Sequence, residues 1–177
     1  MVARPATPSR SATPRTLGAV DDVVPHPDLG RLAELLGDWE GEGRGQWGGG
    51  DIFGYREWLR FAHNGKPFVS YTQRTAASDD GRPLHGESGY WRAGADGSVE
   101  LVLAHGIGVA EIEIGGWDGN TLRLRTESLR TSPTAKPVTA LERDFELDGD
   151  TLRYTLRMST TSEAPRWHLS GELHRAR

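Results

Sequence analysis

The segment LLGDWEGEGRG, residues 35–45, decides the fold that we expect. It places one tryptophan, Trp39, among glycines at a spacing of two residues, with Gly37, Gly41 and Gly43 around it. A flexible linker would not need the indole, and an ordinary buried strand would be weakened by so many glycines. A strand that bends sharply as it closes a barrel can use both residue types. The segment therefore predicts the first strand of a β-barrel, with Trp39 plugging its closed end.

The rest of the chain alternates apolar and polar residues in short runs that are separated by turns. In TLRYTLRM, one face carries Leu152, Tyr154, Leu156 and Met158. Arginines and threonines occupy the other face, as in a barrel wall that is polar outside and apolar inside. Turn sequences such as NGKP (64–67) and DGD (148–150) separate the runs. The count is about ten short strands, so we expect an all-β, antiparallel, up-and-down barrel.

Two segments precede the expected barrel. Residues 1–24 are rich in Pro, Ser, Thr, Ala and Arg and have almost nothing to bury, so we expect a disordered tail. HPDLGRLAELL (26–36) has leucines at helical spacing, with Asp28 able to cap its start and Gly37 able to end it. This segment predicts one short amphipathic helix. A chain of 177 residues, 36% of them hydrophobic, suits one core, so we expect residues 25–177 to form a single domain.

Composition argues against several classes of function. The formal net charge is −4 and no basic stripe occurs in the body of the chain, which gives no electrostatic footprint for nucleic acid. The chain has no cysteine, which excludes disulfides and thiolate chemistry. No apolar run approaches the roughly 18 to 20 residues of a membrane helix, and no apolar secretory segment is evident. We therefore expect a soluble, cytoplasmic protein with neither nucleic-acid nor membrane partners.

A barrel of this size implies a pocket, because more than about eight strands leave more interior than side chains fill. The sequence lacks the short motifs of serine esterases, zinc peptidases and P-loop proteins. Glu111 and Glu113 could form a carboxylate pair on one strand face. We expect this pair to face water, with Ile112 and Ile114 on the opposite, apolar face.

The six histidines do not define a site by their spacing. His105 ends an expected strand and could line the pocket mouth, while His63 and His85 adjoin turns. His168 and His174 share one face of the last strand, but about 20 Å separates them at strand rise, so they cannot bind one metal together. A three-histidine zinc site drawn from several strands stays open as an alternative that no spacing supports.

Four segments of the chain carry a resemblance to a known family. They are the opening segment and the later segments LAHGIGVAEIE, TSPTAKPVTALERDFELDGDTLRYTLRMST and RWHLSGELHR. Together they resemble the nitrobindins, small haem-binding β-barrel proteins related in shape to fatty-acid-binding proteins. The opening segment matches the family's G-x-W-x-G-x-G from Gly37 to Gly43. G-x-W alone is a weak signal, because lipocalin-type barrels also open with it. The ordered set is more specific, and the resemblance covers residues 30–177.

The resemblance implies one haem b per chain, held at one end of the barrel. It implies that His168, in WHLSGEL, is the axial ligand of the haem iron. It also implies that Lys136, in TAKPVTAL, contacts the haem by pairing with a propionate at the rim. Without the resemblance, Lys136 would be read as an ordinary exposed loop lysine. The far side of the haem is expected to be open and largely apolar, without a dedicated acid or base.

The activity that the resemblance implies is isomerisation of peroxynitrite to nitrate at ferric haem, with nitric oxide bound in the ferrous state. The iron would carry the chemistry, and the protein would supply the ligand and control access. Two alternatives stay open: a haem-free carrier of fatty acid or another apolar ligand, and a sensor of haem or nitric oxide. A homodimer is also compatible with the sequence.

The alternation of apolar residues in the last strand conflicts with the role that the resemblance implies for His168. Trp167, Leu169 and Leu173 alternate on the face opposite to His168, so if they face the core, His168 faces out. Either a bulge or an irregular entry after Pro165 resets the alternation, or the Trp/Leu face packs elsewhere. The sequence does not choose between these two.

Overall fold

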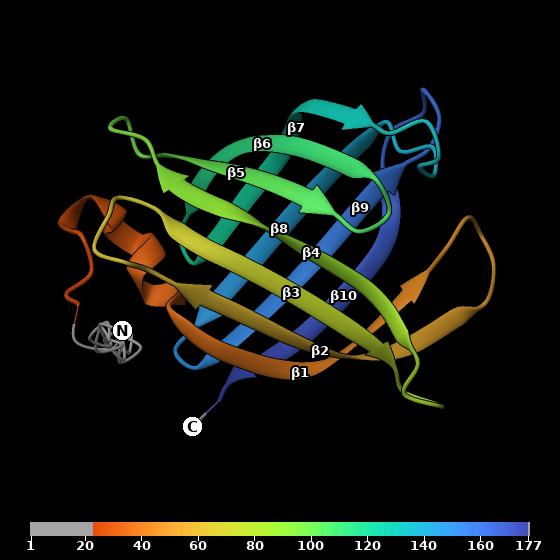
Figure 1. Ribbon diagram of the computed structural model, residues 1–177, viewed down its shortest axis with the longest axis horizontal. Coiled ribbons are helices and arrows are strands. Elements are labelled where there is room, and N and C mark those ends of the chain that lie inside the picture. The colour runs from red at the N-terminus through yellow and green to blue at the C-terminus, as the bar shows by residue number, and fades with distance from the viewer. Residues whose placement is uncertain (1–22, 177) are drawn as a thin grey trace, which may run out of the picture.

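In the computed structural model, which describes residues 23–176, ten antiparallel strands form a closed barrel (Figure 1). The elements in chain order are the 3₁₀ helix η2 (Pro27–Leu35) and the strands β1 (Gly37–Gln46), β2 (Ile52–Ala62), β3 (Val69–Ala77), β4 (Pro83–Ala93), β5 (Ser98–His105), β6 (Val109–Asp118), β7 (Thr121–Thr131), β8 (Ala140–Asp148), β9 (Thr151–Ser159) and β10 (Arg166–Arg175). Each strand pairs with its neighbours in sequence, and β10 pairs with β1, so the ring closes without free edges. The predicted all-β, up-and-down barrel is confirmed.

The glycines of β1 let this strand approach its neighbours more closely than side chains would allow. A methyl group added at Gly41 would collide with the backbone carbonyl of Glu172 in β10. At Gly43 the added methyl would collide with the ring of Tyr55, which pairs with it from β2. Neither glycine has a positive φ, so space rather than backbone conformation demands them. The glycine run of the opening segment is therefore a packing feature of the barrel wall.

We expect Gly41→Ala to destabilise the barrel by about 1–3 kcal/mol, because the obstructing atoms belong to backbone in the β1–β10 ladder. Gly116→Ala is a matched control on β6, because its added methyl would meet nothing closer than the Gly97 carbonyl oxygen at 3.7 Å. Chemical denaturation gives the free energy of unfolding of each variant. Equal stabilities for the two variants would contradict the packing role of Gly41.

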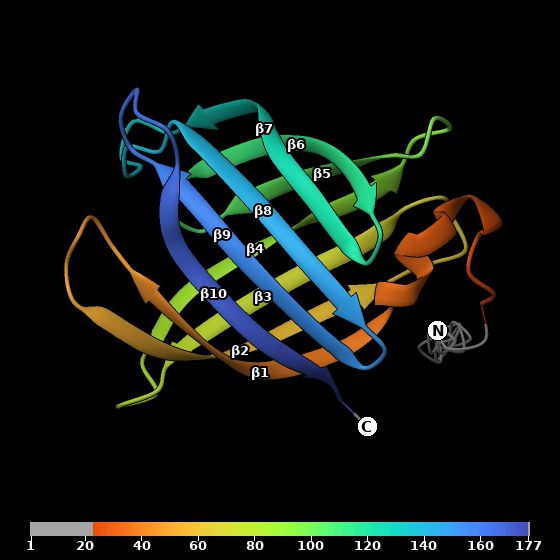
Figure 2. The same ribbon diagram turned by 180° about the vertical axis from the view of Figure 1, so that it is seen from behind.

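Trp39 closes one end of the barrel. Its side chain is fully buried, and its Nε1 donates a 2.8 Å hydrogen bond to the Leu35 carbonyl oxygen at the end of η2. Figures 1 and 2 show η2 at this end, and its buried leucines join the indole in the main apolar cluster. The predicted plug is confirmed, and with it the structural role of Trp39.

The helix lies where the sequence predicts it but starts differently. Its 3₁₀ turns are interrupted at Gly30, where φ is 51°. His26 caps the first turn, because its Nδ1 accepts a hydrogen bond from the Asp28 backbone N–H at 3.2 Å. The prediction that Asp28 is the cap was wrong, since its own N–H is the donor that needs a partner. The helix ends at Leu35 with Leu36 as its C-cap, so Gly37, where φ is 124°, is the first residue of β1 and not the cap of the helix. Of the predicted tail, residues 1–22 lie outside the described residues.

The apolar core occupies the end of the barrel next to η2. Its fully buried side chains include Trp91, Leu101, Leu122, Leu124, Leu152 and Leu173. The loops that follow β1, β3, β5, β7 and β9 gather at the other end (Figures 1 and 2). Within residues 23–176, no helix is both long enough and apolar enough to cross a membrane. The side chains that do not fill the core therefore surround the second end, where the site lies.

Candidate functional site

The barrel contains a cavity of about 280 Å³ at the end away from η2. Its wall is mostly apolar, and the apolar lining includes Phe53, Leu84, Val109, Val138, Leu141 and Met158. The rim carries Trp47 from the β1–β2 loop, Ile107 from the β5–β6 turn and Lys136 from the β7–β8 link. The pocket that the strand count implied is confirmed. Its mostly apolar lining suits a ligand with a broad apolar face.

His168 lines this cavity from β10. Its Nδ1 lies 2.6 Å from the carbonyl oxygen of Gln46. A carbonyl can only accept, so Nδ1–H donates and Nε2 keeps its lone pair. The ring of Trp47 packs edge-on against the imidazole, with the centroids 5.4 Å apart. Burial lowers the pKa of His168 below its usual 6.5, so the imidazole is neutral at neutral pH. A neutral imidazole with a fixed tautomer is the form that ligates a metal.

A β-bulge explains how His168 faces inward. Trp167 and Leu169 pair with consecutive residues of β9, Arg157 and Leu156, so His168 has no opposite residue in that ladder. His168 and Leu169 then both line the cavity. Of the two explanations left open by the sequence, the irregularity near the start of the last strand is the one that the structure contains.

Lys136 lies at the rim of the same cavity. Its Nζ is 4.2 Å from the centroid of the Trp47 ring, which in turn contacts His168. The two residues singled out by the family resemblance, although 32 positions apart in the sequence, thus converge on one indole. An exposed ammonium at this place is able to pair with an anionic group of a ligand seated in the mouth.

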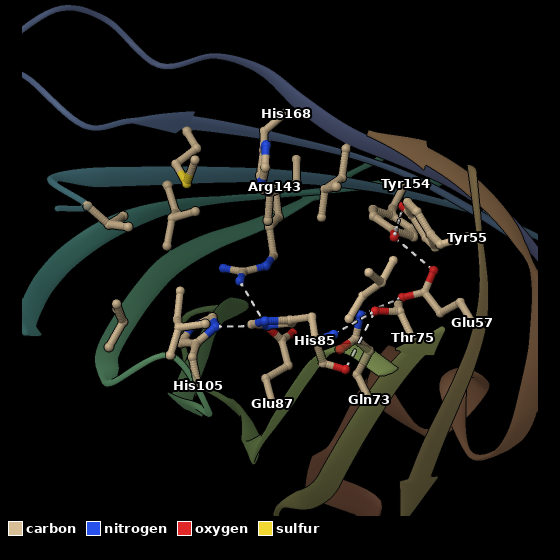
Figure 3. Close-up of a pocket in the computed structure, with 18 of the residues that line it drawn as sticks. Tyr55, Glu57, Gln73, Thr75, His85, Glu87, His105, Arg143, Tyr154 and His168 are labelled. Atoms are coloured by element: carbon tan, nitrogen blue, oxygen red, sulfur yellow. Dashed lines mark hydrogen bonds and ion pairs between the residues drawn. The ribbon is translucent and has the colours of Figure 1, made fainter. Parts of the chain in front are cut away.

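A group of buried charged side chains lies across the cavity from His168, and Arg143 reaches it from the side of His168 (Figure 3). Arg143 on β8 donates hydrogen bonds to Glu111 at 2.8 Å and to Glu113 at 2.6 Å. It also lies 3.5 Å from Glu87 on β4. Burial alone would lower the pKa of Arg143, but the three carboxylates outweigh it and raise the pKa well above its usual value. The guanidinium is therefore a permanent positive charge inside the barrel.

The positions of Glu111 and Glu113 correct the sequence prediction. These side chains are 3% and 0% exposed, whereas Ile112 and Ile114 are 39% and 40% exposed. The two faces of β6 are thus reversed from the prediction. The physical reason is Arg143, which enters from β8 and offsets the cost of burying both carboxylates. The pattern of one strand cannot reveal a counter-charge that lies on another.

His105 contacts two carboxylates of this cluster and brings one further cavity residue, His85, beside them. Its Nε2 is 2.8 Å from Glu111, and its Nδ1 is 3.0 Å from Glu87. His85 Nε2 lies 3.3 Å from the same Glu87 oxygen. Burial alone would lower the pKa of His105, but the bonds to Glu111 and Glu87 raise it to about 9. His105 lines the cavity, as expected, but this wall is charged where the resemblance implied a largely apolar one.

A second buried polar group surrounds Glu57 on β2. The Tyr154 hydroxyl donates to one Glu57 oxygen at 2.8 Å, and the Gln73 amide donates to the other at 2.9 Å. The Tyr55 hydroxyl lies 2.6 Å from that of Tyr154. Burial raises the pKa of Glu57 to about 7. Sequence reasoning missed Glu57, although its odd position between Tyr55 and Leu59 in β2 is a signal that it faces inward.

We expect Glu57 to make the stability of the protein depend on pH. The native state holds this proton up to a pKa of about 7 and the unfolded chain up to about 4.5. The contribution to stability is therefore complete below pH 4.5 and is lost as the pH rises through 7. The loss is up to about 3 kcal/mol. Glu57→Gln should remove this pH dependence. The wild type should therefore lose stability relative to this variant as the pH rises from 4.5 through 7.

Urea denaturation of both proteins at a series of pH values measures this difference. Glu40→Gln, on the exposed face of β1, controls for the removal of one carboxyl group. A stability difference between wild type and Glu57→Gln that does not change with pH would contradict the expectation.

Comparison with known proteins places this geometry in a family. The sequence model of the "THAP4-like, heme-binding beta-barrel domain" matches residues 28–175. The chain belongs to this family. Its matched region includes both His168 and Lys136, and the resemblance on which their roles rest is confirmed at the level of the family. Members of the THAP4-like family are haem-binding barrels, so haem is the ligand against which the cavity has to be judged.

Individual relatives of this THAP4-like chain cover nearly its whole length. Peroxynitrite isomerase 2 of Mycobacterium avium is 47% identical over 156 residues, which are 86% of this chain and 97% of that protein. Peroxynitrite isomerase 1 of Mycolicibacterium paratuberculosis is 46% identical with the same coverage. The crystal structure of Rv2717c from M. tuberculosis superposes with a TM-score of 0.80 at 45% identity, over 87% of this chain and 100% of that one.

The cavity has the chemical groups that a haem requires. An apolar wall suits the porphyrin faces, and the His168 imidazole offers a free Nε2 to iron. The Lys136 ammonium at the rim suits a propionate. The Gln46 carbonyl is the outer hydrogen-bond partner that ligating histidines usually have. These groups together fit the family's ligand.

Proposed function

We propose that this chain holds one haem b in the cavity, with His168 Nε2 as the axial ligand of the iron, and that the haem-loaded protein isomerises peroxynitrite to nitrate. The observation that carries the proposal is the His168–Gln46 hydrogen bond, which leaves Nε2 free in an apolar wall. The relatives at 46–47% identity that are named peroxynitrite isomerases support the reaction. Binding of nitric oxide in the ferrous state belongs to the same proposal.

The residues of the chain have separate tasks in this proposal. His168 binds the haem iron through Nε2. The hydrogen bond to the Gln46 carbonyl fixes the orientation of the imidazole and increases its basicity. The apolar wall stabilises the porphyrin by burial, at about 25 cal/mol per Å² of apolar surface, and keeps water away. Lys136 orients the porphyrin at the mouth of the cavity by pairing with a propionate. When bound, the haem supplies the Lewis-acid and redox chemistry that peroxynitrite requires, and the barrel limits access to it.

The test of the binding step is an absorbance titration of the purified, haem-free chain with ferric haem. We expect a Soret band whose absorbance saturates at one haem per chain. The absence of a specific band, together with displacement of a fluorescent fatty acid by lipids, would contradict the proposal and favour a carrier of apolar ligands.

The test of the reaction is stopped-flow decay of peroxynitrite with haem-loaded protein, haem-free protein and free haem at equal concentrations. Isomerisation keeps all atoms of peroxynitrite in nitrate, so the loaded protein should accelerate decay and increase the yield of nitrate over nitrite. A rate and a product ratio equal to those of the haem-free protein would contradict the proposed activity.

We expect Lys136→Ala to weaken haem retention by no more than about fivefold, because an exposed ion pair contributes about 1 kcal/mol or less. Lys66→Ala is the control, since Lys66 is exposed in the β2–β3 loop, away from the cavity. Transfer of haem to an excess of an acceptor protein gives the dissociation rate. A loss as large as that caused by removing the His168 imidazole would contradict the role of Lys136 at the rim.

Three further expectations stay predictions of the sequence. They are a cytoplasmic location, a homodimer, and the division into a tail at 1–24 and a domain at 25–177.

A further inference from the structure

Three side chains on the wall opposite His168 place their potential ligand atoms in a small triangle. His85 Nε2 is 3.3 Å from His105 Nδ1 and 3.3 Å from Glu87 Oε2. His105 Nδ1 is 3.0 Å from the same Glu87 oxygen. We propose that His85, Glu87 and His105 bind a divalent transition-metal ion, separately from the haem.

The size of the triangle matches the coordination sphere of such an ion. Bonds of about 2.0–2.1 Å from a tetrahedral metal to nitrogen or oxygen place its ligand atoms about 3.3 Å apart. The three separations here are close to that value without any movement of the backbone. Two imidazoles and one carboxylate are also a common ligand set for zinc and for non-haem iron.

The strands explain why these three residues meet. His85 and Glu87 lie two positions apart on β4, so both point into the barrel. His105 ends β5 and pairs directly with Glu87 in the β4–β5 ladder. Their side chains are 25%, 8% and 5% exposed, in that order. The ligand set is therefore held by regular sheet rather than by a loop, which favours a preformed site.

The surroundings of the triangle supply an outer hydrogen-bond partner. His105 uses its other nitrogen, Nε2, to contact Glu111 at 2.8 Å. A carboxylate on the second ring nitrogen is the arrangement that fixes and strengthens metal-bound histidines. Figure 3 shows the imidazole of His105 beside His85 and Glu87, across the cavity from His168.

The residues around the triangle could also accommodate the charge of a bound cation. The carboxylates of Glu87, Glu111 and Glu113 surround the single guanidinium of Arg143. Within the described residues, one buried oxygen of Glu111 and one of Glu113 have no hydrogen-bond partner. A divalent ion bound here would replace the positive charge that a proton between His105 and its carboxylate neighbours otherwise supplies.

The site faces the same cavity as the proposed haem. All three residues line that cavity, so the remaining coordination positions of the ion point into it and are open to water or a small anion. His168 belongs to the opposite wall and contributes nothing to the triangle. The metal site therefore stands whether or not the haem proposal holds.

Equilibrium dialysis of the chelator-stripped, full-length chain against micromolar Zn²⁺, with zinc counted by mass spectrometry, tests the proposal. Zinc is distinct from haem iron, so the chain can be measured with and without haem. We expect about one zinc per chain, and binding weakened by more than about tenfold in His85→Gln and in Glu87→Gln. Co²⁺ should give the intense visible bands of a tetrahedral site in the haem-free chain.

Two variants make the result specific. His63→Gln removes a turn histidine at the other end of the barrel and should bind zinc as wild type does. His168→Ala should also keep the zinc while it loses haem, which separates failure of one proposal from failure of the other. If wild type binds no zinc at one equivalent, the metal site is wrong. It is also wrong if His85→Gln and Glu87→Gln bind as much zinc as wild type. The cluster would then be held together by protons alone.

Discussion

Haem affinity should fall by more than about 100-fold in His168→Ala. The substitution removes the imidazole whose Nε2 is free in the apolar wall, because its Nδ1 is committed to Gln46. Burial of the porphyrin would still favour binding, so some weak uptake should persist without the spectrum of a histidine-ligated iron. Absorbance titration with ferric haem measures both the affinity and the spectrum.

His174→Ala is the matched control for this experiment. His174 lies on the same strand, but its side chain is 63% exposed. Free imidazole added to His168→Ala should restore a histidine-like spectrum, since the mutation leaves space for it beside Gln46. An affinity and spectrum of His168→Ala equal to those of the control would contradict the assignment of the ligand.

Arg143→Met should destabilise the barrel by about 3–5 kcal/mol. The substitution keeps most of the side-chain volume but removes the positive charge that contacts Glu111, Glu113 and Glu87. Their carboxylates would then be buried without an adequate partner, and that cost exceeds the gain from a larger apolar surface. This is the largest effect that we expect on stability from one polar side chain.

Arg157→Met provides the comparison on the neighbouring strand. Arg157 pairs with Asp144 at 2.7 Å, but its side chain is 35% exposed. Its removal should cost about 1 kcal/mol or less, because water screens the pair. Guanidinium denaturation gives both free energies. A loss in Arg143→Met no larger than that in Arg157→Met would show that the buried cluster does not depend on its guanidinium.

The fold was predictable because local and global signals agree along most of the chain. The glycine spacing around Trp39 predicted the first strand of a barrel, and the collisions that a methyl group would make at Gly41 and Gly43 explain why glycines are needed there. The ends of elements were harder to place. β7 continues to Thr131, because its last residues extend the ladder with β6. Pairing with a neighbouring strand, rather than local composition, decides where such a strand ends.

The site was predictable only in part. His168 and Lys136 came from the resemblance to a family, and the bulge that turns His168 inward could only be posed as one of two alternatives. The charged wall was not foreseen, because Arg143 and Glu111 are 32 positions apart and neither strand carries a signal of the other. A polar residue at an inward position of an alternating strand, such as Glu57 in β2, is the sequence signal that a polar group is buried in the barrel.

The central claim is that a haem sits in this cavity with its iron on His168 Nε2. A crystal structure of the haem-loaded chain tests it most directly. We expect density for one porphyrin in the cavity, with the iron bonded to His168 Nε2 and the Nδ1–Gln46 hydrogen bond preserved. Iron bonded instead to His85 or His105, or a haem held outside the barrel, would contradict it.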